Sequence, residues 1–343
     1  MSRLRVPPPV PHAPPLGALL RQYAAGSAVA CEPVGQGLLN RGYRLCTTRG
    51  RYFLKHHSDP ETAAPGAIAR QHRATQRLAD LGVPVAPPLP GRDGRTVAVV
   101  GGHAYALHPW IDGRHRHGGQ LTTVQCGRLG ALLGVVHASL ERVMPAHGRA
   151  RAAPADSADP ARTFALIDDL LARVERRRPA DSFDELARHR LLERRALLEQ
   201  HAGRRPPRGG CVGWVHGDFH PFNLLYRGDA PAAIVDWDRL GVQPRAEEAV
   251  RAAVIFFVRP AGTLDLPKVR AYARAYRRTA GATPSELAAA VHRVWWERLN
   301  DFWMLRWHYE RGDTRADPQF PAASALAVWW TREYDAVCDA FAR

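Results

Sequence analysis

The chain has 343 residues, of which 45% are hydrophobic, so it is long enough and apolar enough to bury a substantial core, and wholesale disorder is excluded. No continuous apolar run approaches the roughly 18 residues that a bilayer-spanning helix needs, and we therefore expect no membrane partner. The unusual property is the formal charge of +15: lysine and arginine together number 48, and only Lys55 and Lys268 are lysine.

The basic residues and the cysteines bear on the class of partner and on the compartment. A basic chain suggests nucleic-acid binding, but the arginines are spread along the whole length in helical stretches such as residues 172–178. We favour solvated helix faces as the explanation, so nucleic acid is not an expected partner. The five cysteines are scattered and form no Cys-x-x-Cys pair, which argues against disulfides or zinc and favours a reducing cytoplasm.

The N-terminal third has a mixed, strand-bearing pattern. Residues 1–15 form a proline-rich leader without the continuous apolar segment of a signal peptide. Two short β-like runs at 43–48 and 51–57 are separated by an Arg-Gly pair, which predicts a hairpin. A helix is predicted over 65–82 and a second pair of strands over 96–110.

From residue 121 onward the pattern becomes helical, with apolar residues recurring every three or four positions. Helices are predicted at 121–143, 161–177, 182–202, 244–257, 266–280, 284–311 and 321–341. The sequence has no internal repeat. The simplest layout is an α+β chain with a leader at 1–15, a small strand-rich N-lobe at 16–109 and a larger, mainly helical C-lobe at 110–343.

Polar groups interrupt apolar runs two thirds of the way along the chain. The segment "WVHGDFHPFNLLY", residues 214–226, predicts a strand, a tight loop allowed by Gly217, and a second strand. Asp218 and Asn223 share that loop, and Asp236 ends the later apolar run "AAIVD". One carboxylate is suited to orient a hydroxyl and accept its proton. The amide and the second carboxylate offer the hard oxygen ligands that Mg²⁺ prefers beside polyphosphate.

The motifs "HGDFHPFN" and "IVDWD" resemble the catalytic loop and the metal-binding strand of the aminoglycoside phosphotransferase and choline kinase superfamily. The resemblance spans nearly the whole chain. "GQGLLNRGYRL" is similar to the family's nucleotide loop, "RYFLKHH" to its lysine strand and "YALHPWIDG" to its inter-lobe hinge. It implies a two-lobed, protein-kinase-like fold. It also implies transfer of the γ-phosphoryl group of ATP, with Mg²⁺, to a hydroxyl of a small molecule.

The resemblance further implies roles for individual residues. Asp218 would be the catalytic base, or at least would position the acceptor hydroxyl. Asn223 and Asp236 would bind Mg²⁺, and Lys55 would contact the α- and β-phosphates of ATP. The other nucleotide-binding residues that it implies are Gly35, Gly37, Asn40, Gln71, His108 and Trp110.

One position departs from the kinase pattern. In kinases a glutamate on the first long helix pairs with the strand lysine, but register with "LGVPV" puts Gln71 there. Three arrangements stay open: Glu61 pairs with Lys55, Gln71 suffices, or phosphate alone holds the lysine. The departure and the basic charge leave an alternative, a catalytically weak, nucleotide-binding or regulatory kinase-like protein whose surface binds an acidic partner. We favour the enzyme because the whole metal-and-base set is present.

Several features bear on the acceptor. The aromatic segment 294–313 predicts core packing, and the alternative is a pocket in which Glu297 or Asp301 meets a polar substrate. Glu247 and Glu248 either pair locally with arginines or present charge to a cationic acceptor. Because a protein of charge +15 steers a polycation poorly, we favour a neutral, zwitterionic or anionic hydroxyl compound. Examples are a sugar, an amino alcohol, a hydroxy amino acid and an antibiotic other than an aminoglycoside.

Overall fold

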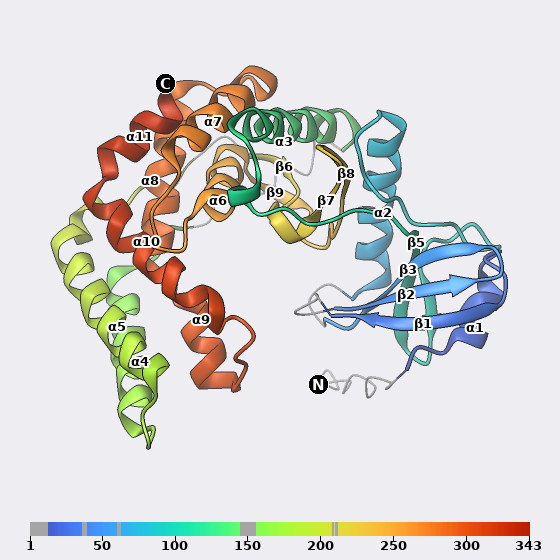
Figure 1. Cartoon of the computed structure of the whole chain (residues 1–343), viewed down its shortest axis with the longest axis horizontal. Helices are drawn as coiled ribbons and strands as arrows, with labels where there is room; N and C mark the ends of the chain where they lie inside the picture. Colours follow the sequence, from blue (N-terminus) through green and yellow to red (C-terminus); the bar gives the residue numbers. More distant parts are fainter. Residues whose placement is uncertain (1–12, 36–39, 60–62, 145–155, 208, 210–211) are drawn as a thin grey trace, which may run out of the picture. The chain divides into compact units, whose positions relative to one another are not determined.

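The computed structural model describes residues 13–35, 40–59, 63–144, 156–207, 209 and 212–343 (Figure 1). These residues group into two compact units. Unit 1 comprises the described parts of Met1–Arg116, Ser139–Pro145 and His216–Gly241, and unit 2 those of His117–Ala138, Ala146–Val215 and Val242–Arg343. The predicted catalytic loop and metal strand therefore pack in unit 1. The lobe boundary expected near residue 109 stays a prediction, because packing units need not coincide with lobes.

Unit 1 is built on a five-stranded antiparallel sheet with the order β1-β2-β3-β5-β4. Its strands are β1 (Ala28–Val34), β2 (Arg41–Thr47), β3 (Gly50–His57), β4 (Ala98–Val100) and β5 (His103–Pro109). The predicted hairpin and the predicted strand pair are both confirmed, whereas β1 was not predicted. Lys55 lies on β3, opposite Gly42 of β2 and Ala106 of β5, in the middle of the sheet.

The core of unit 1 lies between the sheet and helix α1 (Leu16–Gln22), which packs against β1 and β4. Its buried members include Leu19, Tyr23, Leu45, Leu54, Tyr105 and Leu107. Helix α2 (Pro65–Asp80), predicted over 65–82, buries its own apolar face in the same unit. Because side chains alternate along a strand, Leu54 points into the core and Lys55 to the opposite face of the sheet.

The predicted strand, loop and strand of the catalytic segment are confirmed. Strand β6 (Val212–Val215) leads into the loop, a single 3-10 turn covers Pro221–Asn223, and β7 (Leu224–Arg227) follows. Strand β7 pairs antiparallel with β8 (Ala230–Ile234). Asp236, just beyond the end of β8, therefore lies beside the start of β7.

The chain beyond residue 120 is mainly helical (Figure 1). The long helices are α3 (Thr123–Val143), α4 (Pro160–Arg176), α5 (Ser182–His201), α6 (Arg245–Phe257), α7 (Leu266–Ala280), α8 (Pro284–Asn300), α10 (Phe320–Arg332) and α11 (Tyr334–Ala342). Strand β9 (Gly241–Pro244) pairs with β6. The helices α3 to α7 confirm the first five predicted for this part, within two residues at each end. No helix in the described ranges is both long and apolar enough to cross a membrane.

Two predicted helices are wrong in their extent. The segment 284–311 is not continuous: α8 ends one residue before Asp301, where the backbone is extended, and the short helix α9 (Trp303–Arg306) follows. The Asp301 carboxylate accepts the Trp303 N–H at 3.0 Å, so a local side chain competes with the helix hydrogen bonds. The segment 321–341 is likewise divided at Glu333, whose backbone leaves the helical region.

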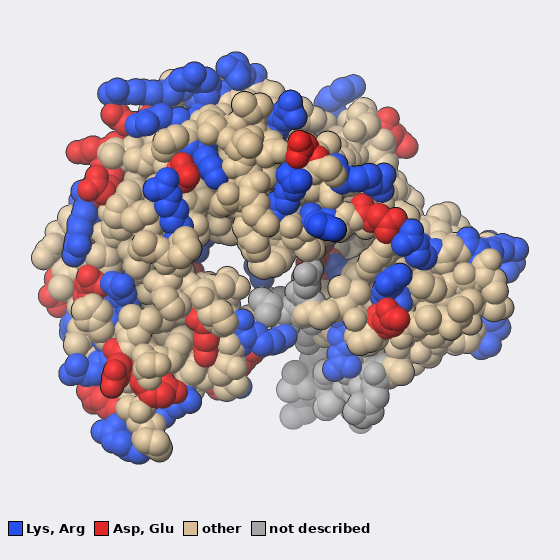
Figure 2. Space-filling view, viewed as in Figure 1, with Lys and Arg blue, Asp and Glu red and all other residues tan. Residues whose placement is uncertain are grey.

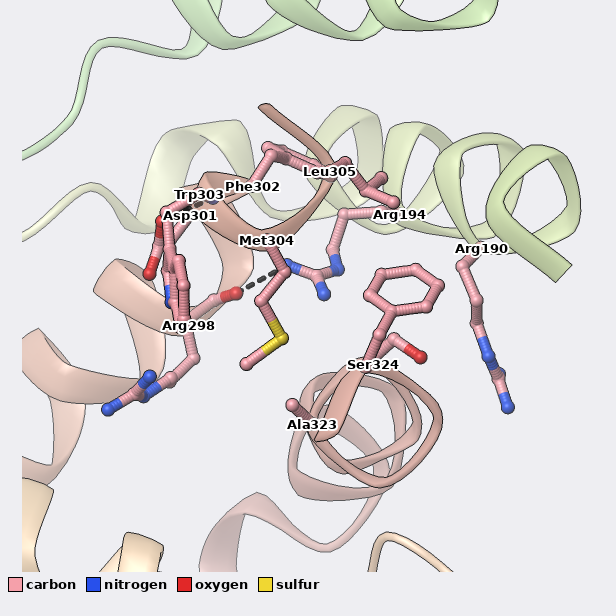
Figure 3. Close-up of a pocket in the computed structure, with 11 residues that line it drawn as sticks. Arg190, Arg194, Arg298, Asp301, Phe302, Trp303, Met304, Leu305, Ala323 and Ser324 are labelled. Atoms are coloured by element: carbon pink, nitrogen blue, oxygen red, sulfur yellow. Dashed lines mark hydrogen bonds between the residues drawn. The ribbon is translucent and has the colours of Figure 1, made fainter. Parts of the chain in front are cut away.

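The break after α8 leaves a small cavity of about 40 Å³ in unit 2, whose lining is drawn in Figure 3. The Arg194 guanidinium is buried there and lies over the Phe302 ring at 5.0 Å. It donates hydrogen bonds to the carbonyls of Arg298 and Leu299, and burial lowers the pKa of Arg194 to about 10. Arg194 thus satisfies the last carbonyls of α8. Asp301 lines this cavity and its carboxylate is bonded to the Trp303 N–H, so a contact of Asp301 with an acceptor stays a prediction.

The other acceptor candidates in unit 2 pair with basic groups. The pairs are Glu297–Arg251 (2.8 Å), Glu247–Arg293 (2.6 Å) and Glu248–His137 (2.7 Å). Trp295 and Trp296 are fully buried. The core-packing interpretation of the aromatic segment is therefore confirmed for these tryptophans, and the three glutamates hold helices together.

Replacing Gly130 of α3 with alanine should destabilise unit 2, because the new Cβ would stand 2.1 Å from the Tyr272 carbonyl oxygen of α7. Backbone cannot step aside, so the helices must separate, at a cost of about 1–3 kcal/mol. Gly127 is the matched control on the same helix: its Cβ would meet the Ala271 carbonyl oxygen at 3.5 Å, and alanine there should be neutral or stabilising. Urea unfolding measures both variants, and equal stabilities would contradict the close packing of α3 on α7.

Candidate active site

Gly217 makes the sharp turn of the catalytic loop. Its φ is +87°, and a Cβ at this position would stand 2.1 Å from the Arg239 carbonyl oxygen. Glycine is the residue that meets both demands. The loop therefore lies directly against the backbone that follows β8, and this close approach gathers the polar residues of both segments.

His216 connects the loop to the strand that precedes Asp236. Its ring is fully buried, its Nδ1 accepts the Asp218 N–H at 3.2 Å, and its Nε2 lies 3.0 Å from the Val235 carbonyl oxygen. Since Nδ1 accepts a hydrogen bond, the proton of the neutral ring resides on Nε2 and is donated to that carbonyl. The imidazole is thus a brace between the Asp218 backbone and the residue before Asp236.

Asp218 presents an ionised carboxylate beside two basic groups. Its Oδ2 is 3.5 Å from Nε2 of His220 and 3.9 Å from Nε of Arg239. Burial would raise the pKa of Asp218, but the hydrogen bond and charge of His220 outweigh burial and lower the pKa below its ordinary value. The side chain is 39% exposed, so it can accept a hydrogen bond, and then a proton, from an incoming hydroxyl.

Asn223 is held on the same loop through its side-chain nitrogen. Its Nδ2 donates to the Asp218 carbonyl oxygen at 2.8 Å and lies 3.2 Å from Nε2 of His220. No described residue donates a hydrogen bond to its Oδ1. The loop therefore fixes the amide through its nitrogen and leaves the oxygen for a ligand.

Asp236 is the one non-glycine residue with a positive φ, 61°, in the part of the chain that the structure describes. A left-handed L-residue costs roughly 1–2 kcal/mol, and such strain concentrates at functional sites. Within the described ranges no group of three or more His, Cys, Asp and Glu side chains is arranged for a metal. The oxygens of Asn223 and Asp236 instead fit Mg²⁺, which takes one or two carboxylates and completes its shell with water and phosphate.

Lys55 lies at the centre of a buried ion cluster. Its Nζ is 2.6 Å from Oδ1 of Asp236 and 2.7 Å from Oδ2 of Asp238, and the residue is only 8% exposed. Burial would lower the pKa of Lys55, but the two carboxylates outweigh burial and raise it. Burial would raise the pKa of Asp236, and the Lys55 charge lowers it to about 2. Lys55 and Asp236 are therefore both charged at neutral pH.

Two residues predicted to bind nucleotide meet Asp238. The Asn40 Nδ2 donates to Oδ2 of Asp238 at 2.5 Å, and its Oδ1 accepts the two backbone N–H groups that follow β3. The Gln71 Nε2 donates to the Asp238 carbonyl oxygen at 2.8 Å. We call Lys55, Asp236, Asp238, Asn40 and Gln71 the lysine–aspartate cluster. Asp238 was missed as a site residue in the sequence, although the second aspartate of "IVDWD" was its signal.

The glycine-rich loop is described in part. Gly35 follows β1, is exposed, and has open space where a Cβ would stand. Gly37 and Glu61 lie outside the described residues. Their predicted roles, at the nucleotide and as a partner of Lys55, therefore stay predictions.

The two hinge residues are bonded within unit 1. Nδ1 of His108 lies 2.9 Å from the Ala86 carbonyl oxygen, and burial lowers the pKa of His108 to about 4. Trp110 donates its backbone N–H to the Arg51 carbonyl at 3.2 Å, so this donor is used beside the sheet. Neither side chain is hydrogen-bonded to the lysine–aspartate cluster in the described residues, and the adenine contacts expected of both stay predictions.

A profile of the phosphotransferase enzyme family matches residues 30–282, well over half of the chain. The chain belongs to this family. The matched span contains the catalytic loop, the Asp236 segment and the Lys55 strand.

Relatives of this phosphotransferase agree with that assignment. It is 24% identical over 295 residues to the homoserine kinase of Methylobacillus flagellatus, with 83% of each chain covered. Its fold is similar to that of an aminoglycoside phosphotransferase from Alicyclobacillus acidocaldarius, with a TM-score of 0.60 at 15% identity over 97% of this chain and 96% of that one. A microcompartment-associated aminopropanol kinase gives a TM-score of 0.61 at 16% identity, over 94% of this chain and 97% of that one.

These similarities confirm the predicted fold and enzyme class. The fold is protein-kinase-like, with an antiparallel sheet near the N-terminus and a mainly helical remainder. The chain is a phosphotransferase of the small-molecule kinase type. The alternative of a catalytically weak regulatory protein is not favoured by these relatives.

The left-handed backbone of Asp236 makes a prediction that is independent of activity. Asp236→Gly and Asp236→Ala remove the same carboxylate from this phosphotransferase, but only glycine adopts a φ of 61° without strain. We therefore expect the glycine variant to be more stable than the alanine variant by about 1 kcal/mol. Urea unfolding without nucleotide measures the difference. Equal stabilities would mean that the backbone is not held in the left-handed region.

Proposed function

We propose that this phosphotransferase transfers the γ-phosphoryl group of ATP, bound with Mg²⁺, to a hydroxyl of a small molecule. The observation that carries the proposal is the double anchoring of His216, which contacts the Asp218 N–H at 3.2 Å and the Val235 carbonyl at 3.0 Å. This brace supports the candidate base and the candidate metal ligand Asp236 together. The amide oxygen of Asn223, which accepts no hydrogen bond from the described residues, completes a set of groups typical of phosphoryl transfer.

The chemical step assigns the proton to Asp218. Its carboxylate accepts the hydrogen bond of the acceptor hydroxyl and orients the oxygen for in-line attack on the γ-phosphorus. As the new P–O bond forms, the bond from the γ-phosphorus to the β,γ-bridging oxygen breaks and ADP leaves. The hydroxyl proton passes to Asp218, whose lowered pKa keeps it ionised before the reaction. Lys55 offers its ammonium to the phosphate oxygens.

Asn223 and Asp236 are the residues that would hold Mg²⁺. The ion, when bound, supplies positive charge that neutralises the polyphosphate. Oδ1 of Asp236 is 2.6 Å from the Lys55 ammonium, so the group for the metal and the group for the phosphates are direct neighbours. Positioning and charge neutralisation, the two main contributions in this chemistry, thus come from one small region of unit 1.

We infer that the acceptor is a small hydroxy amino acid or amino alcohol. Relatives of 24% and 25% identity are named homoserine kinase, and a structural neighbour is named aminopropanol kinase. Both names denote small molecules that carry a hydroxyl and an amino group. The net charge of +15 also opposes electrostatic steering of a polycationic acceptor.

The surface and the cysteines support the remaining expectations. On the face drawn in Figure 2, Lys and Arg lie in scattered groups with Asp and Glu among them, and this face has no continuous basic stripe of the kind typical of nucleic-acid binding proteins. Cys31, Cys46, Cys126 and Cys338 are free thiols. Free thiols fit a reducing compartment, and the cytoplasm is part of this proposal.

The proposal is tested by ADP release from ATP and Mg²⁺ across a panel of hydroxy amino acids, amino alcohols, sugars and aminoglycosides. We expect the highest kcat/KM on a hydroxy amino acid or amino alcohol. Asp218→Ala serves as the blank and should lower turnover by roughly 10²–10⁴-fold, the range for loss of an acid–base group. Nucleotide affinity, measured by calorimetry, should stay within a few-fold of the original.

Two outcomes of this screen count against the assignments. Near-normal turnover of Asp218→Ala on the preferred acceptor would show that Asp218 is not the catalytic base. A clear preference for a polycationic aminoglycoside would overturn the acceptor class but leave the reaction type standing.

Metal dependence is tested by thermal unfolding. Asp236→Asn removes the charge but keeps a side chain that tolerates the left-handed backbone, so the fold should survive. The original chain should melt at a higher temperature with ATP and Mg²⁺ than with ATP and a chelator, and Asp236→Asn should lose that difference. Asp218→Ala should retain it. A full Mg²⁺-dependent shift in Asp236→Asn would show that the metal is held elsewhere.

A further inference from the structure

Asp238 is bonded from three directions. Its Oδ2 lies 2.7 Å from the Lys55 ammonium and 2.5 Å from Nδ2 of Asn40, and its carbonyl oxygen accepts Nε2 of Gln71 at 2.8 Å. These three partners lie on β3, at the residue before β2, and on α2. Asp238, which follows β8, therefore connects the lysine strand, the end of the glycine-rich loop and the first long helix of unit 1.

The Lys55 ammonium needs a permanent counter-charge because it is buried. An ion removed from water without a partner is destabilised by several kcal/mol. Kinases supply the charge from a glutamate on the helix that follows the lysine strand. Here that helix offers Gln71, whose amide is neutral and whose hydrogen bond goes to the backbone of Asp238. Gln71, at the helix position where kinases have the partner of the lysine, is thus bonded to Asp238 and not to Lys55.

Of the two carboxylates at Lys55, Asp238 is the one free to be its dedicated partner. The Asp236 side chain is 46% exposed and is the proposed metal ligand, so its charge is shared with a cation. The Asp238 side chain is 13% exposed. Asn40 occupies the same Oδ2 that Lys55 contacts, and Gln71 fixes the carbonyl of the same residue. These bonds hold the Asp238 carboxylate against the Lys55 ammonium.

We propose that Asp238 replaces the helix glutamate of kinases as the positioning residue that holds the Lys55 ammonium where it meets the nucleotide phosphates. The inference rests on the proposed function, since that function assigns Lys55 to ATP. It also accounts for the departure at Gln71: among the described residues, the negative charge beside Lys55 comes from the segment after β8.

The arrangement ties the lysine to the metal segment. Asp236 and Asp238 are separated by one residue, so a short piece of chain sets both the metal ligand and the partner of Lys55. In kinases the partner lies on a helix whose position controls activity. In this chain α2 contributes one neutral hydrogen bond through Gln71, and the lysine is held independently of any charge on α2.

Lysine labelling tests the inference, because the chain has only two lysines. A brief pulse of an amine-acylating reagent followed by peptide mass spectrometry gives the ratio of Lys55 to Lys268 modification. Lys268 bonds to the Gly118 carbonyl in unit 2 and is the internal reference. Asp238→Asn should raise the ratio at least about tenfold, the lower range for loss of a charged hydrogen bond. Asp229→Asn, which removes an exposed carboxylate in the turn between β7 and β8, is the charge-matched control and should leave the ratio unchanged.

Rescue from α2 separates positioning from a merely structural role. In the Asp238→Asn background, Gln71→Glu places a carboxylate on the helix and should lower the labelling ratio and the KM for ATP toward the original values. In the original chain Gln71→Glu should give no gain, since Asp238 already supplies the counter-charge and the exchange only removes the hydrogen bond to its carbonyl. The two backgrounds form a double-mutant cycle in which Gln71→Glu is expected to help only when the Asp238 carboxylate is absent.

The outcomes distinguish this inference from the proposed function. If Mg²⁺-ATP does not protect Lys55 from labelling in the original chain, the assignment of Lys55 to ATP fails. If it protects Lys55, but Asp238→Asn labels like the original or Gln71→Glu gives no rescue, only the present inference is overturned. If Asp238→Asn does not fold, Asp238→Glu carries the test: it should keep the original labelling ratio, and a tenfold rise would overturn the inference.

Discussion

The ammonium of Lys55 is buried, and a buried charge is tolerated only with counter-charges at hydrogen-bond distance. This constraint explains why two carboxylates after β8 both turn to β3, at 2.6 and 2.7 Å from Nζ. Two acids this close repel one another unless a cation lies between them. The ion cluster therefore forms only when β3 and the segment after β8 come together, and it fastens parts of unit 1 that are 181 residues apart in sequence.

Two backbone positions make that meeting possible. Gly217 lets the catalytic loop approach the Arg239 carbonyl more closely than any side chain allows, and Asp236 adopts a left-handed φ of 61°. His216 then fastens the loop to the Val235 carbonyl. Each strained or crowded position is compensated by a bond formed a residue or two away. These contacts hold the loop against the backbone that follows β8, and a base and a metal ligand require such fixed positions.

Local pattern predicted what depends on local contacts. The hairpin that carries Lys55 and the loop bearing Asp218 and Asn223 were recognised because the turn signals and the motif spacing lie within a few residues. Asp238 was missed because its place in the site is visible only from its contacts, such as the hydrogen bond from Asn40, which is 198 residues distant in the sequence. For the same reason Asn40 was predicted only as a nucleotide contact and Gln71 as a nucleotide contact or a partner of Lys55, whereas both side chains bond Asp238. The break at Asp301 was missed because apolar spacing continues across it while one carboxylate caps the chain.

The use of lysine at position 55, in a chain whose basic residues apart from Lys268 are otherwise arginine, follows from the same geometry. An ammonium is compact and carries three N–H donors, of which two are accounted for by Asp236 and Asp238. A guanidinium spreads five donors over a planar fork, and the 8% exposure of Lys55 leaves little room for one between the carboxylates. On the proposed function the third donor goes to a phosphate oxygen. The Lys55 ammonium thus neutralises the two carboxylates with two of its N–H donors. Because it has three donors, one remains for the ligand.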